Sequence, residues 1–84
     1  MIKGLTMAMT TVNVTKEWTL LTSSISLIQF KNNSVQLSVG ALPTDNTSFF
    51  ELSSGDFFSN NSAVSVYARV ITNYNCTATA VVLT

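Results

Sequence analysis

The chain has 84 residues, of which 46% are hydrophobic, and its four lysine or arginine residues balance four aspartate or glutamate residues to a formal net charge of zero. This length fits one domain, and four scattered cations cannot build the phosphate-contacting surface of a nucleic-acid-binding protein. Because the chain has no histidine and a single cysteine, Cys76, it forms no intrachain disulfide and lacks the ligands of the usual zinc sites.

The beginning of the chain carries no apolar run of the kind found in signal peptides, and no stretch approaches the ~18 apolar residues of a membrane span. We therefore expect neither a membrane nor a nucleic acid as partner. Residues 1–9, with Gly4, predict a flexible N-terminal arm, and residues 10–84 predict one domain. A core this small, without a disulfide or zinc, favours stabilisation by association with other copies or with a larger assembly.

The first third of the domain alternates apolar and polar residues with the period of two that strands show. Residues 11–15 and residues 17–22 have this pattern, and one bulged strand would accommodate both. Residues 25–30 predict the next strand, in which either of two apolar pairs could face the core, a pattern that fits a strand buried on both sides. The two pairs are Ile25 with Leu27, and Ile28 with Phe30.

Turn-forming residues divide the middle of the chain. Residues 31–34, Lys-Asn-Asn-Ser, have the composition of a hairpin turn that leads into a strand at residues 35–39. Residues 41–48, which include a proline, predict a surface loop. Residues 49–52 return to the extended pattern, and residues 53–56, Ser-Ser-Gly-Asp, predict a tight turn.

The last third of the chain holds the strongest strand pattern, at residues 63–71, and a further strand at residues 77–84 that we expect to pair with it as a hairpin. Helix formers are scarce throughout. The sequence therefore predicts an all-β fold: a small single-domain antiparallel β-sandwich, or a partly open barrel, of six to eight short strands. The predicted core is Trp18, Leu20, Leu27, Leu37, Val39, Phe49, Leu52, Val64, Val66, Ala68 and Val82.

No residue pattern commits the chain to catalysis. Glu51 and Asp56 are close in sequence, but they flank a turn, where aspartate is a favoured turn residue and Glu51 is an outward strand position. Cys76 has no histidine to activate it as a nucleophile. The spacing of the acidic residues matches no calcium loop. We expect no catalytic residue, no metal site and no cofactor, and hence no enzyme.

Exposed aromatic residues are the candidates for contacts with other proteins. Phe49-Phe50 and Phe57-Phe58 are adjacent pairs, and since neighbours on a strand face opposite ways, one member of each pair should be exposed. Arg69 has three interpretations: a contact residue, a solvated strand arginine, or a buried partner of Glu51 or Asp56. The candidate contact residues are Phe50, Phe58, Tyr67, Arg69 and Tyr74.

Four short motifs stand in a recognisable order: Gly40-Ala41-Leu42-Pro43, Phe50-Glu51-Leu52, Gly55 and Val66-Tyr67-Ala68-Arg69. With the Trp18 strand before them, they resemble small virion structural proteins of tailed bacteriophages, over residues 12–84. Asp56 stands where a glutamate would be expected after the glycine.

The resemblance implies a β-sandwich that is present in many copies on the capsid or tail, as a decoration, cement or accessory protein. Its implied partners are major capsid or tail proteins and further copies of itself, and its implied location is a virion assembled in the cytoplasm of a host bacterium. Two other classes stay open: a receptor- or carbohydrate-binding module that uses exposed aromatic rings, and an enzyme subunit whose catalytic group comes from a partner.

Overall fold

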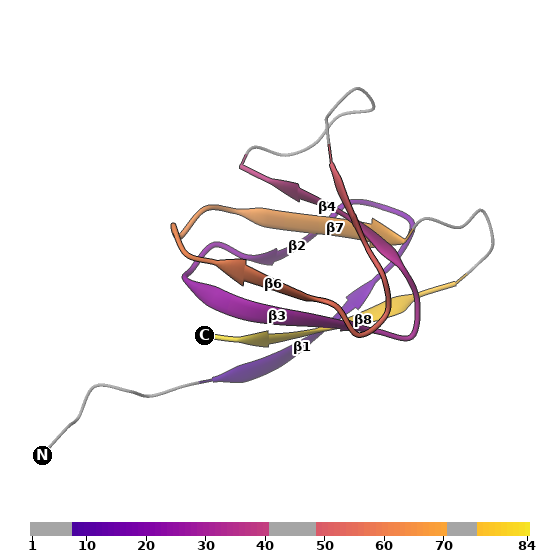
Figure 1. Ribbon diagram of the computed structural model, residues 1–84, viewed down its shortest axis with the longest axis horizontal. Coiled ribbons are helices and arrows are strands. Elements are labelled where there is room, and N and C mark those ends of the chain that lie inside the picture. The colour runs from indigo at the N-terminus through magenta and orange to yellow at the C-terminus, as the bar shows by residue number, and fades with distance from the viewer. Residues whose placement is uncertain (1–7, 41–48, 71–75) are drawn as a thin grey trace, which may run out of the picture.

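The computed structural model describes residues 8–40, 49–70 and 76–84, which form eight strands in two four-stranded antiparallel sheets (Figure 1). The order β1-β8-β3-β6 makes the first, here called the β8 sheet, and β2-β7-β4-β5 makes the second, the β7 sheet. No helix that could cross a bilayer occurs in the described residues. The predicted all-β sandwich is confirmed. The strands are β1 Met9–Val14, β2 Thr19–Thr22, β3 Ser26–Lys31, β4 Val35–Val39, β5 Phe50–Leu52, β6 Phe57–Asn60, β7 Val66–Val70 and β8 Ala78–Leu83.

Most connections pass from one sheet to the other, so the strand pairings differ from those that the sequence suggested. Only β4 and β5 are neighbours both in the chain and in a sheet. The turn predicted at residues 31–34 does not close a hairpin, because Lys31 ends β3 and residues 32–34 cross to β4 in the other sheet. β8 pairs with β1 and β3, not with β7, and residues 11–15 and 17–22 belong to separate strands in opposite sheets.

The core fills the space between the sheets with small and branched side chains from both. Ile28 and Phe30, not Ile25 and Leu27, face inward from β3, and both are fully buried. Phe30 is the largest buried side chain of the described residues. The buried apolar side chains are Val14, Leu21, Ile28, Phe30, Val35, Leu37, Val66, Ala68, Val70, Ala78, Ala80 and Val82.

Four residues of the predicted core are exposed instead: Leu20, Leu27, Val39 and Phe49. Leu20 and Leu27 occupy outward positions of their strands, because their register partners Tyr67 and Leu83 also face outward. Trp18 and Val64 are half-buried and lie outside the strands, and Leu52 packs against the rim of the core. The remaining four predicted core residues, Leu37, Val66, Ala68 and Val82, are buried as expected.

The buried side-chain amide of Asn60 links the end of β6 to the segments before β3 and β7. Asn60, the last residue of β6, is 2% exposed, and its Nδ2 donates to the carbonyl oxygens of Ser24 at 2.8 Å and Val64 at 2.9 Å. The chain between Asn60 and Val64 includes Ala63, whose φ of +55° lies in the left-handed region that alanine seldom adopts. We infer that the two amide hydrogen bonds hold this strained loop against the segment before β3.

The turn at residues 53–56 matches its sequence prediction and explains Asp56. The amide of Asp56 donates to the carbonyl of Ser53 at 3.0 Å, and its Oδ2 accepts from the Ser53 amide at 2.8 Å. Gly55 has a φ of +93°, which glycine adopts without cost. The turn also bonds to β3, since the Phe30 amide donates to the Asp56 carbonyl at 3.1 Å. Asp56 therefore has a structural role.

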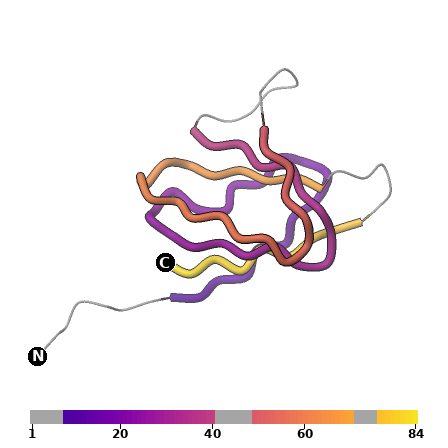
Figure 2. Tube along the Cα trace, in the orientation of Figure 1, coloured from indigo at the N-terminus to yellow at the C-terminus, as the bar shows by residue number. Residues whose placement is uncertain are grey.

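The ordered domain begins earlier than residue 10. Met9 pairs with Leu83 in β1, and Ala8 exchanges two backbone hydrogen bonds of 2.9 Å with Thr84. Ala8 and Met9, which the sequence placed in a flexible arm, thus belong to the β8 sheet. Figure 2 shows the first described segment running beside the C-terminal segment. The rest of the predicted arm, residues 1–7, lies outside the described residues.

Candidate interaction surface

The outer surface of the β8 sheet carries apolar side chains on all four of its strands. Period-two alternation turns Met9, Leu27, Phe57, Val81 and Leu83 outward, and together with Gln29 they line an open hollow. We call these five side chains the apolar face. Met9 is 71% exposed and Phe57 is 58% exposed. Large apolar side chains gathered on one surface of a small protein mark a site of contact with another molecule.

The apolar face extends toward the loop that precedes β3 and carries almost no charge. A second hollow shares Leu27 and Leu83 with the first and adds Ile25 at its rim. Among the outward-facing residues of the four strands, Lys31 alone is charged. An uncharged surface of this kind suits an apolar protein surface as partner, because no charged group has to be desolvated on contact.

The second phenylalanine pair is oriented opposite to the sequence expectation. Phe58 was a candidate contact residue, but it pairs with the buried Ile28 and packs against the core. Phe57 pairs with Gln29 and is the exposed member. The pairing of β6 with β3 fixes this choice, and the sequence of β6 alone does not contain that information.

Arg69 lies over aromatic rings on the outer surface of the β7 sheet. Its guanidinium carbon is 4.4 Å from the centroid of the Trp18 ring and 6.0 Å from that of Phe49, and the two rings are 6.4 Å apart. Its Nε donates to Oε1 of Gln36, its register partner on β4, at 2.7 Å. The cation–π contact and the hydrogen bond hold Arg69 flat against the sheet. Arg69 is thus neither solvated freely nor paired with Glu51 or Asp56.

Arg69→Ala is expected to uncover the only tryptophan of the protein. Because the guanidinium covers the Trp18 ring, its removal should shift the fluorescence emission to longer wavelength and increase quenching by acrylamide. The cost in stability should be about 0.5–2 kcal/mol, the range of such contacts. Lys31→Ala, which removes a cation from the other sheet, is the control and should leave the emission unchanged. Equal quenching of both variants would contradict the stacked arrangement.

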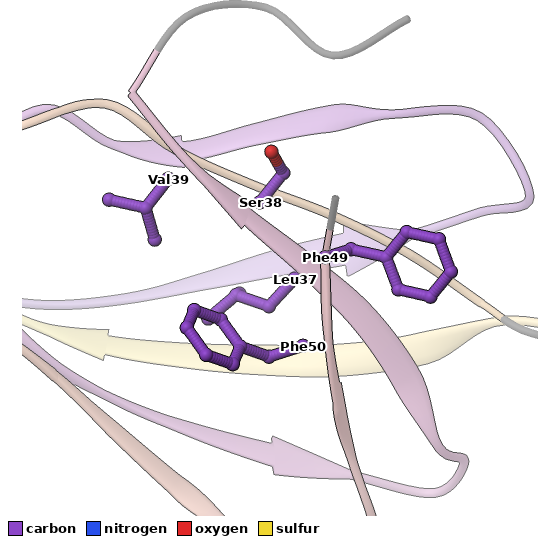
Figure 3. Close-up of a pocket in the computed structure, with 5 residues that line it drawn as sticks. All are labelled: Leu37, Ser38, Val39, Phe49 and Phe50. Carbon is purple, nitrogen blue, oxygen red and sulfur yellow. The ribbon is translucent and has the colours of Figure 1, made fainter. Parts of the chain in front are cut away.

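The other candidate contact residues are distributed over separate surfaces. Phe50 lines an open hollow at the β4–β5 edge with Leu37, Ser38, Val39 and Phe49 (Figure 3). Phe49 and Phe50 point to opposite sides of the chain, with Phe50 on the side of Leu37.

Tyr67 is half-buried on the outer surface of the β7 sheet, opposite Ser38. It therefore shares the sheet surface of Arg69 and not that of the apolar face. Tyr74 lies outside the described residues.

The polar groups that could have supported chemistry are not gathered in a cleft. Glu51 is exposed opposite Gln36 on the edge strand β5, whereas Asp56 is engaged in its turn. Cys76 is a free, half-buried thiol ahead of β8. Within the described ranges, no three acidic, cysteine or histidine residues come close enough to hold a metal ion. Glu51, Asp56 and Cys76 thus lie at separate places in the described part of the fold.

Sequence reasoning did not identify Met9, Leu27, Val81 and Leu83 as surface residues of interest. A signal was present, because residues 25–30 and 77–84 carry apolar side chains at both even and odd positions. A strand with one solvated face alternates, whereas a strand that is apolar on both faces is covered on both sides. Each of these two strands alone indicated a second covered side, and their pairing in the structure joins those sides into one apolar sheet surface.

No family model, no curated protein and no solved structure matches this chain.

Proposed function

We propose that this protein is a structural subunit of a larger assembly, to which it binds through the apolar face. The observation that carries the proposal is the set of outward-facing apolar side chains on all four strands of the β8 sheet, of which Met9, Leu27 and Phe57 are exposed, with Lys31 as the single charge. Because β1 and β6 form the two edges of this sheet, the surface spans its full width. The role is binding and not catalysis.

The size of the apolar face favours an assembly with many contacts over a single tight complex. Four strands about 4.8 Å apart, with about five residues of 3.3 Å each, cover roughly 300–400 Å² on each partner. Stable pairwise complexes bury about 1,200–2,000 Å² in total. One contact through this face is therefore weak, and repeated contacts in a particle would supply the missing affinity.

The proposed context is the virion of a tailed bacteriophage, where the protein would sit on the capsid or tail as a decoration, cement or accessory subunit. This rests on the resemblance of the Gly40–Pro43, Phe50–Leu52 and Val66–Arg69 motifs to small virion structural proteins. A domain with a small core and zero net charge is consistent with a subunit that neighbours stabilise. Mass spectrometry of particles purified from the source should find the chain in many copies, and its absence from them would exclude this context.

A carbohydrate-binding role has weaker support. Sugar-stacking sites need an aromatic ring with an open face, and Trp18 is half-buried with Arg69 over its ring. Phe57 is open, but the residues around it are apolar except for Gln29 and offer sugar hydroxyl groups few hydrogen-bond partners.

The double substitution Leu27→Ser and Phe57→Ser is expected to lower binding to the assembled particle by at least about tenfold, because two large apolar contacts are lost. The measurement is the occupancy of added protein on particles that lack it, with circular dichroism as a check of the fold. Leu20→Ser is the matched control, since Leu20 is 50% exposed on the opposite sheet. Wild-type occupancy of the double variant would refute the role of the apolar face.

A further inference from the structure

The four edges of the sandwich differ in how well they are protected against pairing with another strand. β5 has three residues and includes Glu51, β6 has four residues, and β2 has four residues with an irregular register between Leu20 and Thr22. Short strands, charges and bulges are the usual protection of sheet edges. β1 has none of these: its six residues, MTTVNV, pair regularly with β8 and include no charge and no proline.

The free side of β1 presents backbone groups at alternate residues. Ala8 and Thr84 exchange both of their backbone hydrogen bonds, at 2.9 Å each. In an antiparallel pair such residues alternate with residues whose amides and carbonyls point away from the partner. In the register of β1 with β8, the groups of Met9, Thr11 and Asn13 therefore point outward. Among the described residues, no strand pairs with this side of β1.

We propose that a second copy of this chain pairs along β1, antiparallel and with a two-fold axis at Thr11. The symmetry then sets Thr11 opposite Thr11 of the second copy, and Met9 opposite Asn13 of the second copy. All three outward-pointing residues find hydrogen-bonding partners, because each such pair exchanges two bonds. Threonine opposite threonine is a favourable pair in an antiparallel sheet, and no like charges meet.

The pairing itself depends only on β1, but it also extends the surface used in the proposed function. The two β8 sheets become one eight-stranded sheet, and the side chain of Met9, 71% exposed in the single chain, comes to lie beside the second copy. The two apolar faces then lie on the same side of the combined sheet, because a two-fold axis perpendicular to the sheet keeps that side common to both copies. A pair of chains thus offers a partner about twice the contact area of one.

The decisive test is amide hydrogen exchange by NMR on the full chain, in dilute and in concentrated solution. In the paired state the amides of Met9, Thr11 and Asn13 should exchange at least about tenfold more slowly than in the single chain. The amides of Thr10 and Val12, which bond to β8, should be protected at both concentrations. Sedimentation should show a species of twice the 9.1 kDa of one chain.

Two variants of Thr11 separate the backbone contact from the fold. Thr11→Pro removes an outward-pointing amide, which an edge strand tolerates, and should abolish the dimer. Thr11→Lys places two cations beside each other at the two-fold axis and should have the same effect without changing the backbone. Thr11→Val keeps the amide and is the control that should still dimerise.

A fast exchange of the Met9, Thr11 and Asn13 amides at every concentration, together with a single-chain mass, would overturn the proposal. So would protection of these amides only in the assembled particle, because a strand of a different protein would then occupy the edge. Failure here leaves the proposed function standing if the Leu27→Ser and Phe57→Ser variant loses particle binding. Conversely, a dimer formed by a chain that is absent from particles would support this inference and exclude the proposed virion context.

Discussion

Phe30→Ala is expected to unfold the protein. Phe30 is fully buried in the core between the two sheets, and it is the largest buried side chain of the described residues. Truncation of a buried phenylalanine removes its transfer free energy and leaves a cavity, at a cost of about 3–5 kcal/mol. A domain of this size has little more stability than that to lose. Thermal unfolding followed by circular dichroism should show no cooperative transition.

Phe57→Ala is the matched control for this experiment. The same side chain is removed from the neighbouring strand β6, but Phe57 is exposed on the apolar face. Its truncation should change the free energy of unfolding by no more than about 0.5 kcal/mol, the usual range for surface substitutions. Equal destabilisation by the two substitutions would mean that the assignment of inner and outer faces to β3 and β6 is wrong.

Asn60→Asp is expected to destabilise the protein strongly at neutral pH. The substitution replaces the Nδ2 donor by a carboxylate oxygen that faces the carbonyls of Ser24 and Val64. Two buried acceptors then lose their hydrogen bonds, at about 1–3 kcal/mol each, and a buried negative charge is added. We expect the free energy of unfolding, measured with urea, to fall by at least about 2 kcal/mol.

The loss at Asn60→Asp should depend on pH in a definite direction. Burial beside two carbonyl oxygens raises the pKa of the new carboxyl in the folded state, so the folded protein binds its proton more tightly than the unfolded chain. Stability therefore falls as pH rises through the carboxyl titration and partly returns in acid. Asn61→Asp is the control, because Asn61 is exposed and its Oδ1 acceptor for Ser59 is retained. A pH-independent loss would contradict the buried position of the side chain.

The sequence predicted the fold class and most strand positions, because period-two alternation is a local property. β4, β7 and β8 lie within the predicted ranges, and Val66, Ala68 and Val82 face the core as expected. Residues 53–56 form the expected turn, since its Ser-Ser-Gly-Asp sequence supplies both the side-chain acceptor and the left-handed glycine.

Strand pairing could not be predicted in the same way, because a polar four-residue connection has the same composition in a hairpin and in a crossing between sheets. Residues 31–34 illustrate this, since Lys31 ends β3 and residues 32–34 lead to β4 in the opposite sheet.

The orientation of strands that carry apolar residues at both even and odd positions depended on those pairings. The choice between Leu27 and Ile28, or between Phe57 and Phe58, follows from the partner strand. For this reason the sequence alone did not predict which residues form the apolar face.

The position of β8 between β1 and β3 has a consequence for when the protein can fold. β8 is synthesised after the seven other described strands, yet it bridges strands from the first third of the chain. Until β8 leaves the ribosome, β1 lacks its partner among the described strands and cannot join β3 and β6 in one sheet. Long closed loops slow the search for native contacts, so refolding should take milliseconds to seconds. In the nascent chain, the apolar positions of β1 and β3 that β8 covers therefore stay uncovered until β8 has been synthesised.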